Sequence, residues 1–379
     1  MKKIVFFDTE TTGLRKEDKI TQLAYSYIQP GKHIYGSFSS KPKRVTESVL
    51  VNPEILISPE ASMITGVSNS TVKNLTTFNK TSEYKEINLL SKDKETYFVA
   101  YNAPFDVNML SKDNIELKKS QIIDLYRIAK HLYKNETTTD RNGDTIPLAN
   151  NKLQYFRYLL DFDIDSSFLK LQRDYGLNEV QGHEALSDVL VLEHFFNLVK
   201  TIIIEKQNDE EDLEISSDLD WFDIMLDLTS KPVLEPNITF GNVFEKGTNF
   251  NHCLNTTYEQ YGRVKNGFDY LDWCSENLSL SVDTAYSIKI HFFNNLINGN
   301  IPYNHKFLKY INYGLVFETD IDKIHQGLNI INKPFEYHSS LQEKFISSMD
   351  KQYNENVDKE LGDWFPALFQ KRYVEHISS

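Results

Sequence analysis

The chain has 379 residues, of which 40% are hydrophobic and 25% charged, and its formal net charge at pH 7 is −13. The length favours two domains, and the negative charge argues against a broad basic surface for nucleic acid, while a local basic groove or a metal-based site stays compatible with it. No apolar run reaches the length of a membrane span, so we expect no membrane partner. The start of the chain does not look like a secretory signal, and its two cysteines indicate no disulfide framework, so we expect a cytoplasmic protein.

The first 205 or so residues alternate strand-like and helix-like patterns, which is typical of an α/β domain. Strands are expected in the segments KIVFF, ITQLAYSYI, HIYGSF, TYFVAYN and SQIIDL. Helices are expected after the fourth and fifth strands and in LQYFRYLL and SSFLKLQRDY, with a polar loop or small hairpin at 135–149. The segment EALSDVLVLEHFFNLVKTII has apolar residues at helical spacing, which predicts a long amphipathic helix packed on the sheet.

The composition changes after this helix. Residues 208–220 hold seven Asp or Glu residues and are typical of a solvated linker. WFDIMLDL, which follows, is too apolar for a free linker and favours a helix docked on one of the domains; a docking peptide for a protein partner at 208–228 is the alternative. We therefore divide the chain into a domain at 1–205, an acidic linker and docking segment at 206–235, and an accessory domain at 236–379.

The first strand ends on two carboxylates, Asp8 and Glu10. Residues i and i+2 of a strand point to the same face, so these two side chains lie side by side. Burying two like charges is costly unless something positive lies between them. The strand end is therefore either open to water or a place for a cation.

Two further segments carry acids at the ends of elements. In AYNAPFD, Asp106 lies just after a strand and near the start of a helix. In GHEALSD, His183 precedes Asp188 by five residues, a spacing that does not place both on one helix face. We therefore place His183 on the loop that enters the helix and Asp188 one turn inside it. Each residue alone has an ordinary structural explanation, such as a turn former or a first-turn acid.

Taken in order, DTETTG, YNAPFD and HEALSD resemble the three motifs of the DEDDh family of 3′–5′ exonucleases, which includes polymerase proofreading subunits, ribonuclease T, oligoribonuclease and exonuclease X. The resemblance covers about residues 1–205. It implies a ribonuclease H-like fold, which is an α/β fold with a mixed sheet flanked by helices.

The resemblance also implies a metal site. Two Mg²⁺ or Mn²⁺ ions would be held by four carboxylates, those of Asp8, Glu10, Asp106 and Asp188. Hard ions prefer such oxygen ligands, and a pair of ions can activate water and stabilise the leaving oxygen of a phosphodiester. His183 would be the general base that takes the proton from the attacking water, a role worth about 10²–10⁴-fold in rate.

The residues next to the motifs are implied to contact the terminal 3′ nucleotide: Thr11, Thr12, Gly13, Leu14, Thr65, Asn102 and Phe105. Leu14 would wedge against a base, and such contacts read sugar and stacking surface more than sequence. Two positions differ from the family pattern. Tyr101 and Thr65 stand where the family commonly has His, which affects substrate preference rather than activity.

The second region resembles more faintly the small domain appended to exonuclease X-like proteins, with shared points at Phe240, Gly241, Lys246, Gly247, Tyr270, Leu271 and Trp273. We expect a smaller α+β accessory domain there. Its cysteines and histidines lack the paired spacing of a zinc site, so ordinary packing is expected.

These features predict a two-metal 3′–5′ exonuclease that binds nucleic acid with a free 3′ end and releases nucleoside monophosphates. DNA is favoured over RNA because of the appended domain. The alternatives are an exoribonuclease like ribonuclease T and a non-catalytic nucleic-acid-binding protein on a nuclease fold; the presence of all four acids and His183 argues against the latter. The residues favour no particular oligomeric state.

Overall fold

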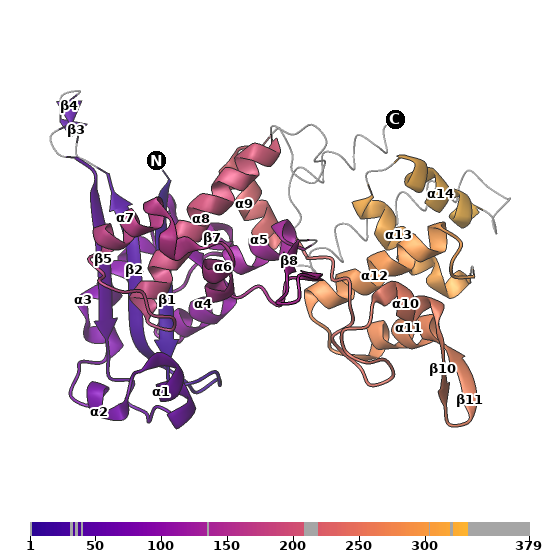
Figure 1. Ribbon diagram of the computed structural model, residues 1–379, viewed down its shortest axis with the longest axis horizontal. Helices are drawn as coiled ribbons and strands as arrows, with labels where there is room; N and C mark the ends of the chain where they lie inside the picture. The colour runs from indigo at the N-terminus through magenta and orange to yellow at the C-terminus, as the bar shows by residue number, and fades with distance from the viewer. Residues whose placement is uncertain are drawn as a thin grey trace. The chain divides into compact units, whose positions relative to one another are not determined.

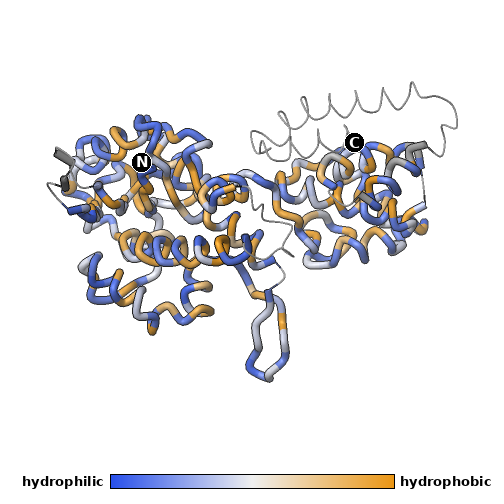
Figure 2. The backbone as a smooth tube through the Cα atoms, turned by 90° about the horizontal axis from the view of Figure 1, so that it is seen from above, coloured by the Kyte–Doolittle hydropathy of each residue, from blue (hydrophilic) through white to orange (hydrophobic). Residues whose placement is uncertain are grey.

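The computed structural model describes residues 2–30, 33–34, 37–38, 41–134, 136–207, 219–302, 304–318 and 321–332. The chain divides into two compact units, Met1–Thr229 and Ser230–Ser379 (Figure 1). Each unit has its own hydrophobic core, and Figure 2 shows apolar residues distributed through both. Among the described residues, no helix is both long enough and apolar enough to span a bilayer.

Unit 1 is built on a five-stranded sheet in the order β5-β2-β1-β6-β7. β1 pairs in parallel with β6, and β6 with β7, while β2 is antiparallel to both β1 and β5. The mixed sheet expected from the sequence is thus confirmed. Its strands are β1 (Lys3–Thr11), β2 (Ile20–Gln29), β5 (Lys43–Leu50), β6 (Thr96–Ala100) and β7 (Ile122–Asp124).

Within the described residues, the strand expected at HIYGSF is found only in two short pieces, and these do not belong to the main sheet. Its described parts, β3 (His33–Ile34) and β4 (Ser37–Phe38), pair with each other in a separate two-stranded ribbon. The third strand along the chain in the main sheet is β5, whose sequence KRVTESVL has no clear apolar alternation. β5 lies at the sheet edge and contains no buried residue, so the hydrophobic pattern that reveals half-buried strands is absent there.

Helices cover both faces of this sheet. One core contains side chains of α5, α6, α7, α8 and α9, and the other contains side chains of α3 and α4. The predicted long helix is α8, and the predicted hairpin at 135–149 is formed by β8 and β9. The elements are α1 (Pro59–Thr65), α2 (Asn69–Val72), η1 (Phe78–Lys80), α3 (Ser82–Leu90), α4 (Ala103–Lys112), η2 (Lys119–Gln121), α5 (Leu125–Leu132), β8 (Thr137–Thr139), β9 (Thr145–Pro147), α6 (Leu153–Leu159), η3 (Phe162–Ile164), α7 (Ser166–Tyr175), α8 (Ala185–Gln207) and α9 (Trp221–Ser230).

Helix α9 packs into the core of unit 1 through Phe222, Met225 and Leu228. Lys2, just before β1, lies with its Nζ 4.0 Å from the centre of the Phe222 ring and 3.3 Å from Asp223 Oδ1. A docked helix at 221–228 agrees with the expectation from its apolar composition. The acidic residues 208–218 lie outside the described residues, so the predicted linker and partner segment stay predictions.

Unit 2 is mostly helical, with one hairpin. Its elements are α10 (Phe250–Asn255), β10 (Thr257–Gln260), β11 (Arg263–Asn266), α11 (Gly267–Asn277), α12 (Val282–Ile297), η4 (His305–Phe307), α13 (Leu308–Phe317) and α14 (Ile321–Asn332). Cys253 and Cys274 are both buried in its core, and His291 Nε2 lies 2.9 Å from the Glu235 carbonyl oxygen. These contacts are those of packed core residues.

Candidate active site

Strand β1 sends its alternate side chains to opposite faces of the sheet. Phe6 belongs to the core on the α8 side, and Phe7 to the core on the α4 side. With a period of two, Asp8 and Glu10 follow Phe6 toward α8, and Thr9 follows Phe7 toward α4. The end of β1 therefore places polar side chains on both faces of the sheet.

Asp106 is held by Thr9 from the α4 side. It lies in the first turn of α4 and is 3% exposed. Its Oδ1 accepts hydrogen bonds from the Thr9 backbone N at 3.0 Å and from Thr9 Oγ1 at 2.6 Å. Asn102, the N-cap of α4, has a φ of 63°, and its backbone N donates to Asp124 Oδ1 at 3.0 Å. Hydrogen bonds with Thr9 of β1 and Asp124 of β7 thus hold the first turn of α4, which carries Asp106, in place.

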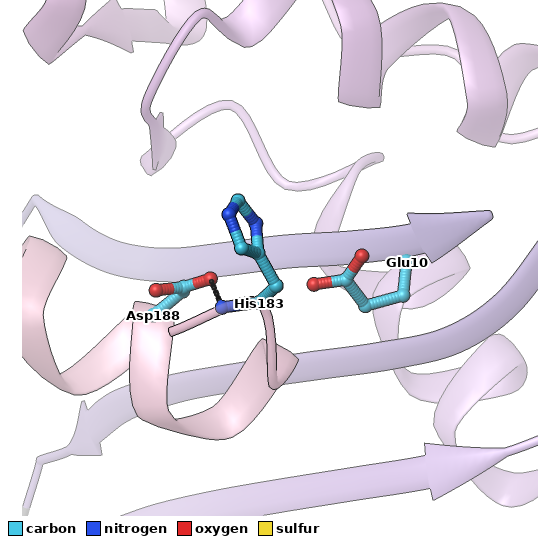
Figure 3. A group of neighbouring side chains, drawn as sticks. All are labelled: Glu10, His183 and Asp188. Carbon is cyan, nitrogen blue, oxygen red and sulfur yellow. Dashed lines mark hydrogen bonds between the residues drawn. The ribbon is translucent and has the colours of Figure 1, made fainter. Parts of the chain in front are cut away.

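His183 lies on the loop before α8, as its spacing from Asp188 predicts. Its φ of 62° is in the left-handed region, which is uncommon for a residue other than glycine and is found mostly where the surroundings enforce it. Asp188 Oδ2 accepts a hydrogen bond from the His183 backbone N at 2.9 Å, and Gln154 Nε2 donates to Asp188 Oδ1 at 2.5 Å. Figure 3 shows the imidazole ring standing between the carboxylates of Asp188 and Glu10.

The structure brings three of the predicted residues into one group. Single ligand atoms of Glu10, His183 and Asp188 lie within 4.8 Å of one another, with His183 exposed and the other two groups enclosed. Asp8 and Asp106 are not members of this group, but both are near enough for their charges to interact with it. The five residues predicted from three distant motifs therefore share one end of the sheet.

The buried acids of this site have raised pKa values. Burial raises the pKa of Glu10 to about 8, with contributions from Asp188, Asp106 and a fifth acid, Glu184. Burial likewise raises the pKa of Asp106 to about 7 and that of Asp188 to about 6, although hydrogen bonds from Thr9 and Gln154 oppose these two shifts. The pKa of Asp8 is raised by burial and then by Asp106, Asp188, Glu10 and Glu184.

Glu184 was not among the site residues predicted from the sequence. Its carboxylate caps α8, accepting hydrogen bonds from the backbone N of Ser187 at 2.8 Å and of Leu186 at 3.4 Å. Gln22 Nε2 of β2 donates to Glu184 Oε1 at 3.1 Å. An acid at the start of a helix, next to His183, is the signal that could have marked it.

The predicted substrate residues are distributed around this site. Thr11 and Thr12 are buried, whereas the Leu14 side chain is 86% exposed. Thr65 ends α1, and its Oγ1 donates to the Ala61 carbonyl oxygen at 3.0 Å. Gly13 follows the end of β1, and Asn102 is the N-cap of α4. Phe105, in the first turn of α4, is partly buried against the core on that face of the sheet. Their contacts with substrate stay predictions.

The donor set fits hard divalent cations. Asp8, Glu10, Asp106 and Asp188 offer carboxylate oxygens, which are the ligands that Mg²⁺ and Mn²⁺ prefer. Burial, together with repulsion from neighbouring acids, raises the pKa values of all four carboxyl groups, so their charged forms are disfavoured in the absence of a cation. Positive charge supplied from outside would therefore stabilise this site.

The raised pKa values also predict how stability depends on pH. Because the folded-state pKa values of these acids lie above the unfolded values, the metal-free folded chain binds more protons than the unfolded chain, and its stability falls as pH rises from about 4 to about 8. Each pKa unit is worth about 1.4 kcal/mol, so shifts of a few units should lower the Tm by roughly 10 °C or more. Thermal unfolding in EDTA across this range measures it, and Mn²⁺ should restore most of the loss at pH 8. A metal-free Tm that stays constant or increases from pH 5 to 8 would contradict the raised pKa values of these acids.

Comparisons with known proteins agree with this geometry. The model of the exonuclease (RNase_T) family matches residues 5–194. A DNA polymerase III of the PolC type from Caldanaerobacter subterraneus subsp. tengcongensis is 27% identical over 139 residues, which are 35% of this chain and 9% of the relative's length. The matched segment thus spans about a tenth of the length of that polymerase.

Two solved structures are also similar. Exonuclease X in complex with 5′ overhanging duplex DNA is 18% identical, with a TM-score of 0.34 over 52% of this chain and 92% of that chain. Exonuclease I from E. coli in complex with a dT13 oligonucleotide is 15% identical, with a TM-score of 0.37 over 100% of both chains. At these values neither structure bears on the placement of individual residues.

Proposed function

Because the chain belongs to the exonuclease family and is a DEDDh-type 3′–5′ exonuclease, we propose that it degrades DNA from the 3′ end with the help of two divalent cations, releasing nucleoside monophosphates. The observation that carries the proposal is the grouping of Glu10, His183 and Asp188, within 4.8 Å, beside the charges of Asp8 and Asp106.

In this proposal Asp8, Glu10, Asp106 and Asp188 hold two Mg²⁺ or Mn²⁺ ions. When bound, such ions balance the carboxylates, make water more acidic and stabilise the charge on a leaving oxygen. Thr9 and Gln154 keep Asp106 and Asp188 in fixed orientations through the hydrogen bonds described above. The rigid strand and the two helix ends thereby hold four like charges that would otherwise separate.

His183 takes the proton of the attacking water in this proposal. Its ring is exposed and stands next to Glu10 and Asp188, so it can reach a water bound at the acid cluster. The constrained backbone of the loop aims the ring, because Asp188 holds the His183 backbone N. A neutral imidazole accepts a proton near neutral pH, which suits it to this role.

The preference for DNA rests on two observations. The matched relative is a DNA polymerase, and the segment 240–273 of unit 2 resembles the domain appended to exonuclease X-like proteins. RNA is the alternative substrate, and its backbone differs by a 2′-hydroxyl that the residues around the 3′ nucleotide would have to accommodate.

A digestion panel tests this preference. Single-stranded DNA, duplex DNA and RNA of one sequence, each labelled at the 5′ end, are incubated with the protein and Mg²⁺ or Mn²⁺. We expect ladders that shorten from the 3′ end, fastest on single-stranded or 3′-exposed DNA, and none in EDTA. Faster loss of RNA would overturn the DNA preference, and equal rates in EDTA would overturn the metal mechanism.

A further inference from the structure

The loop between β1 and β2, residues 12–19, begins two residues after Glu10 and is closed by hydrogen bonds at its base. The Thr12 backbone N donates to the Lys19 carbonyl oxygen at 2.9 Å, and the Lys19 backbone N donates to Thr12 Oγ1 at 3.1 Å. Lys112 of α4 reaches the loop from the helix that carries Asp106, with Nζ 2.9 Å from the Asp18 carbonyl oxygen. The loop is therefore fixed to two of the three elements that supply site carboxylates, β1 and α4.

Asp18 organises the interior of this loop. Its Oδ1 accepts a hydrogen bond from Thr12 Oγ1 at 2.7 Å, and its Oδ2 accepts one from the Arg15 backbone N at 2.5 Å. A Cβ at Gly13 would lie 2.7 Å from Asp18 Oδ2, so a larger residue there would displace this carboxylate from its hydrogen bonds. The negative charge of Asp18 thus faces the interior of the loop, and the residues between Gly13 and Asp18 form its tip.

The tip, residues 14–17 with the sequence Leu-Arg-Lys-Glu, is exposed throughout. In the described part of the chain neither Arg15 nor Lys16 takes part in an ion pair, whereas the neighbouring Lys19 pairs with Glu54 at 3.7 Å. Two unpaired cations on the loop that follows Glu10 stand out in a chain with a net charge of −13. An exonuclease must hold a polyanionic strand next to its own carboxylates, and cations at the rim of the site offset that repulsion.

We propose that Arg15 and Lys16 bind backbone phosphates of the substrate strand close to its 3′ end, and that Asp18 positions them. This inference rests on the proposed function, since it needs a nucleic-acid strand in the site. Arg15 follows Glu10 by five residues, so their Cα atoms are at most ~18 Å apart, a distance that a few nucleotides cover. Arg15 and Lys16 add affinity without reading sequence, because phosphate contacts are the same for every base.

The test compares the full chain with the double variant Arg15→Gln/Lys16→Gln. The Kd for a fluorescent single-stranded 20-mer is measured by anisotropy in EDTA, where turnover is blocked, at several NaCl concentrations. We expect a Kd about two- to thirty-fold higher, the range for two exposed ion pairs. The slope of log K against log salt should be shallower by about 1.4, or 0.7 for each lost phosphate contact with a single strand. With Mg²⁺, KM should increase similarly while kcat changes less than about twofold.

Matched variants separate this role from general charge effects. Lys92→Gln/Lys94→Gln removes two exposed cations just before β6, at the end of the sheet opposite Asp8, and should change neither Kd nor slope. Glu17→Gln should tighten binding. Asp18→Ala also makes the loop more positive, yet it should weaken binding because the tip loses its support, with the salt slope kept.

An unchanged Kd and slope in the Arg15/Lys16 variant would overturn the proposal, as would an equal effect in the Lys92/Lys94 control. Tighter binding by Asp18→Ala would overturn the positioning role. If the wild-type chain degrades neither DNA nor RNA while the Kd and slope shifts occur as expected, the phosphate contacts stand and the proposed function fails.

Discussion

Replacing Asp8 with Asn should lower the single-turnover cleavage rate of the protein by about 10³–10⁵-fold, the scale expected when the charge stabilisation supplied by the metal ions is lost. Asp8 interacts with all of the neighbouring acids, since Asp106, Asp188, Glu10 and Glu184 each raise its pKa. Asn keeps the shape of the side chain and removes the charge, so the cluster loses one of the four carboxylates proposed to hold a cation.

The same change should stabilise the metal-free fold, because it relieves repulsion among the remaining carboxylates. The Tm in EDTA at pH 8 should therefore increase in Asp8→Asn, which distinguishes lost chemistry from lost folding. Asp174→Asn, which alters an exposed acid on α7, is the control and should leave the cleavage rate unchanged. A rate within tenfold of wild type in Asp8→Asn would refute the role of Asp8.

Replacing His183 with Ala should lower kcat by about 10²–10⁴-fold, the usual contribution of a general base. Divalent-cation binding should persist, because the four carboxylates are untouched. The His183 ring is close enough to Glu10 and Asp188 to serve as a ligand instead, so the two roles must be separated by experiment. His183→Gln, which keeps a polar side chain but cannot take a proton, should be as slow as His183→Ala.

Single-turnover cleavage and Mn²⁺ binding, measured on the same His183 preparations, distinguish the roles. Weak Mn²⁺ binding in His183→Ala would make this residue a metal ligand, and wild-type turnover in either variant would remove it from the chemistry. The hydrogen bond from the His183 backbone N to Asp188 supports the loop conformation. This bond involves no side-chain atom of His183, so both substitutions leave it in place.

Much of the site was predictable because its residues occupy ends of regular elements. The i, i+2 spacing of Asp8 and Glu10 in a buried strand gives their common face without any tertiary information. The five-residue spacing of His183 and Asp188 likewise placed one on the loop and the other inside α8, where the structure has them. Local periodicity placed these side chains within their elements, and the resemblance of the three motifs to the exonuclease family joined them into one site.

The supporting residues could not be found in this way. Gln154 contacts Asp188 across 34 positions of the chain, and Thr9 contacts Asp106 across 97. Such contacts depend on how helices pack on the sheet, which no local pattern encodes. The exposed edge strand β5 was missed for a related reason, because it lacks a buried face and therefore the apolar alternation that marks a strand.

Calorimetric titration of Mn²⁺ into metal-stripped wild-type, Asp8→Asn and His183→Ala protein tests the acid cluster most directly. We expect the wild type to bind up to two ions with release of protons, since raised pKa values leave part of the cluster protonated at pH 7. His183→Ala should bind in the same way, and Asp8→Asn should lose at least one ion. A wild-type protein that binds no Mn²⁺, or an Asp8→Asn variant that binds it as the wild type does, would contradict the account.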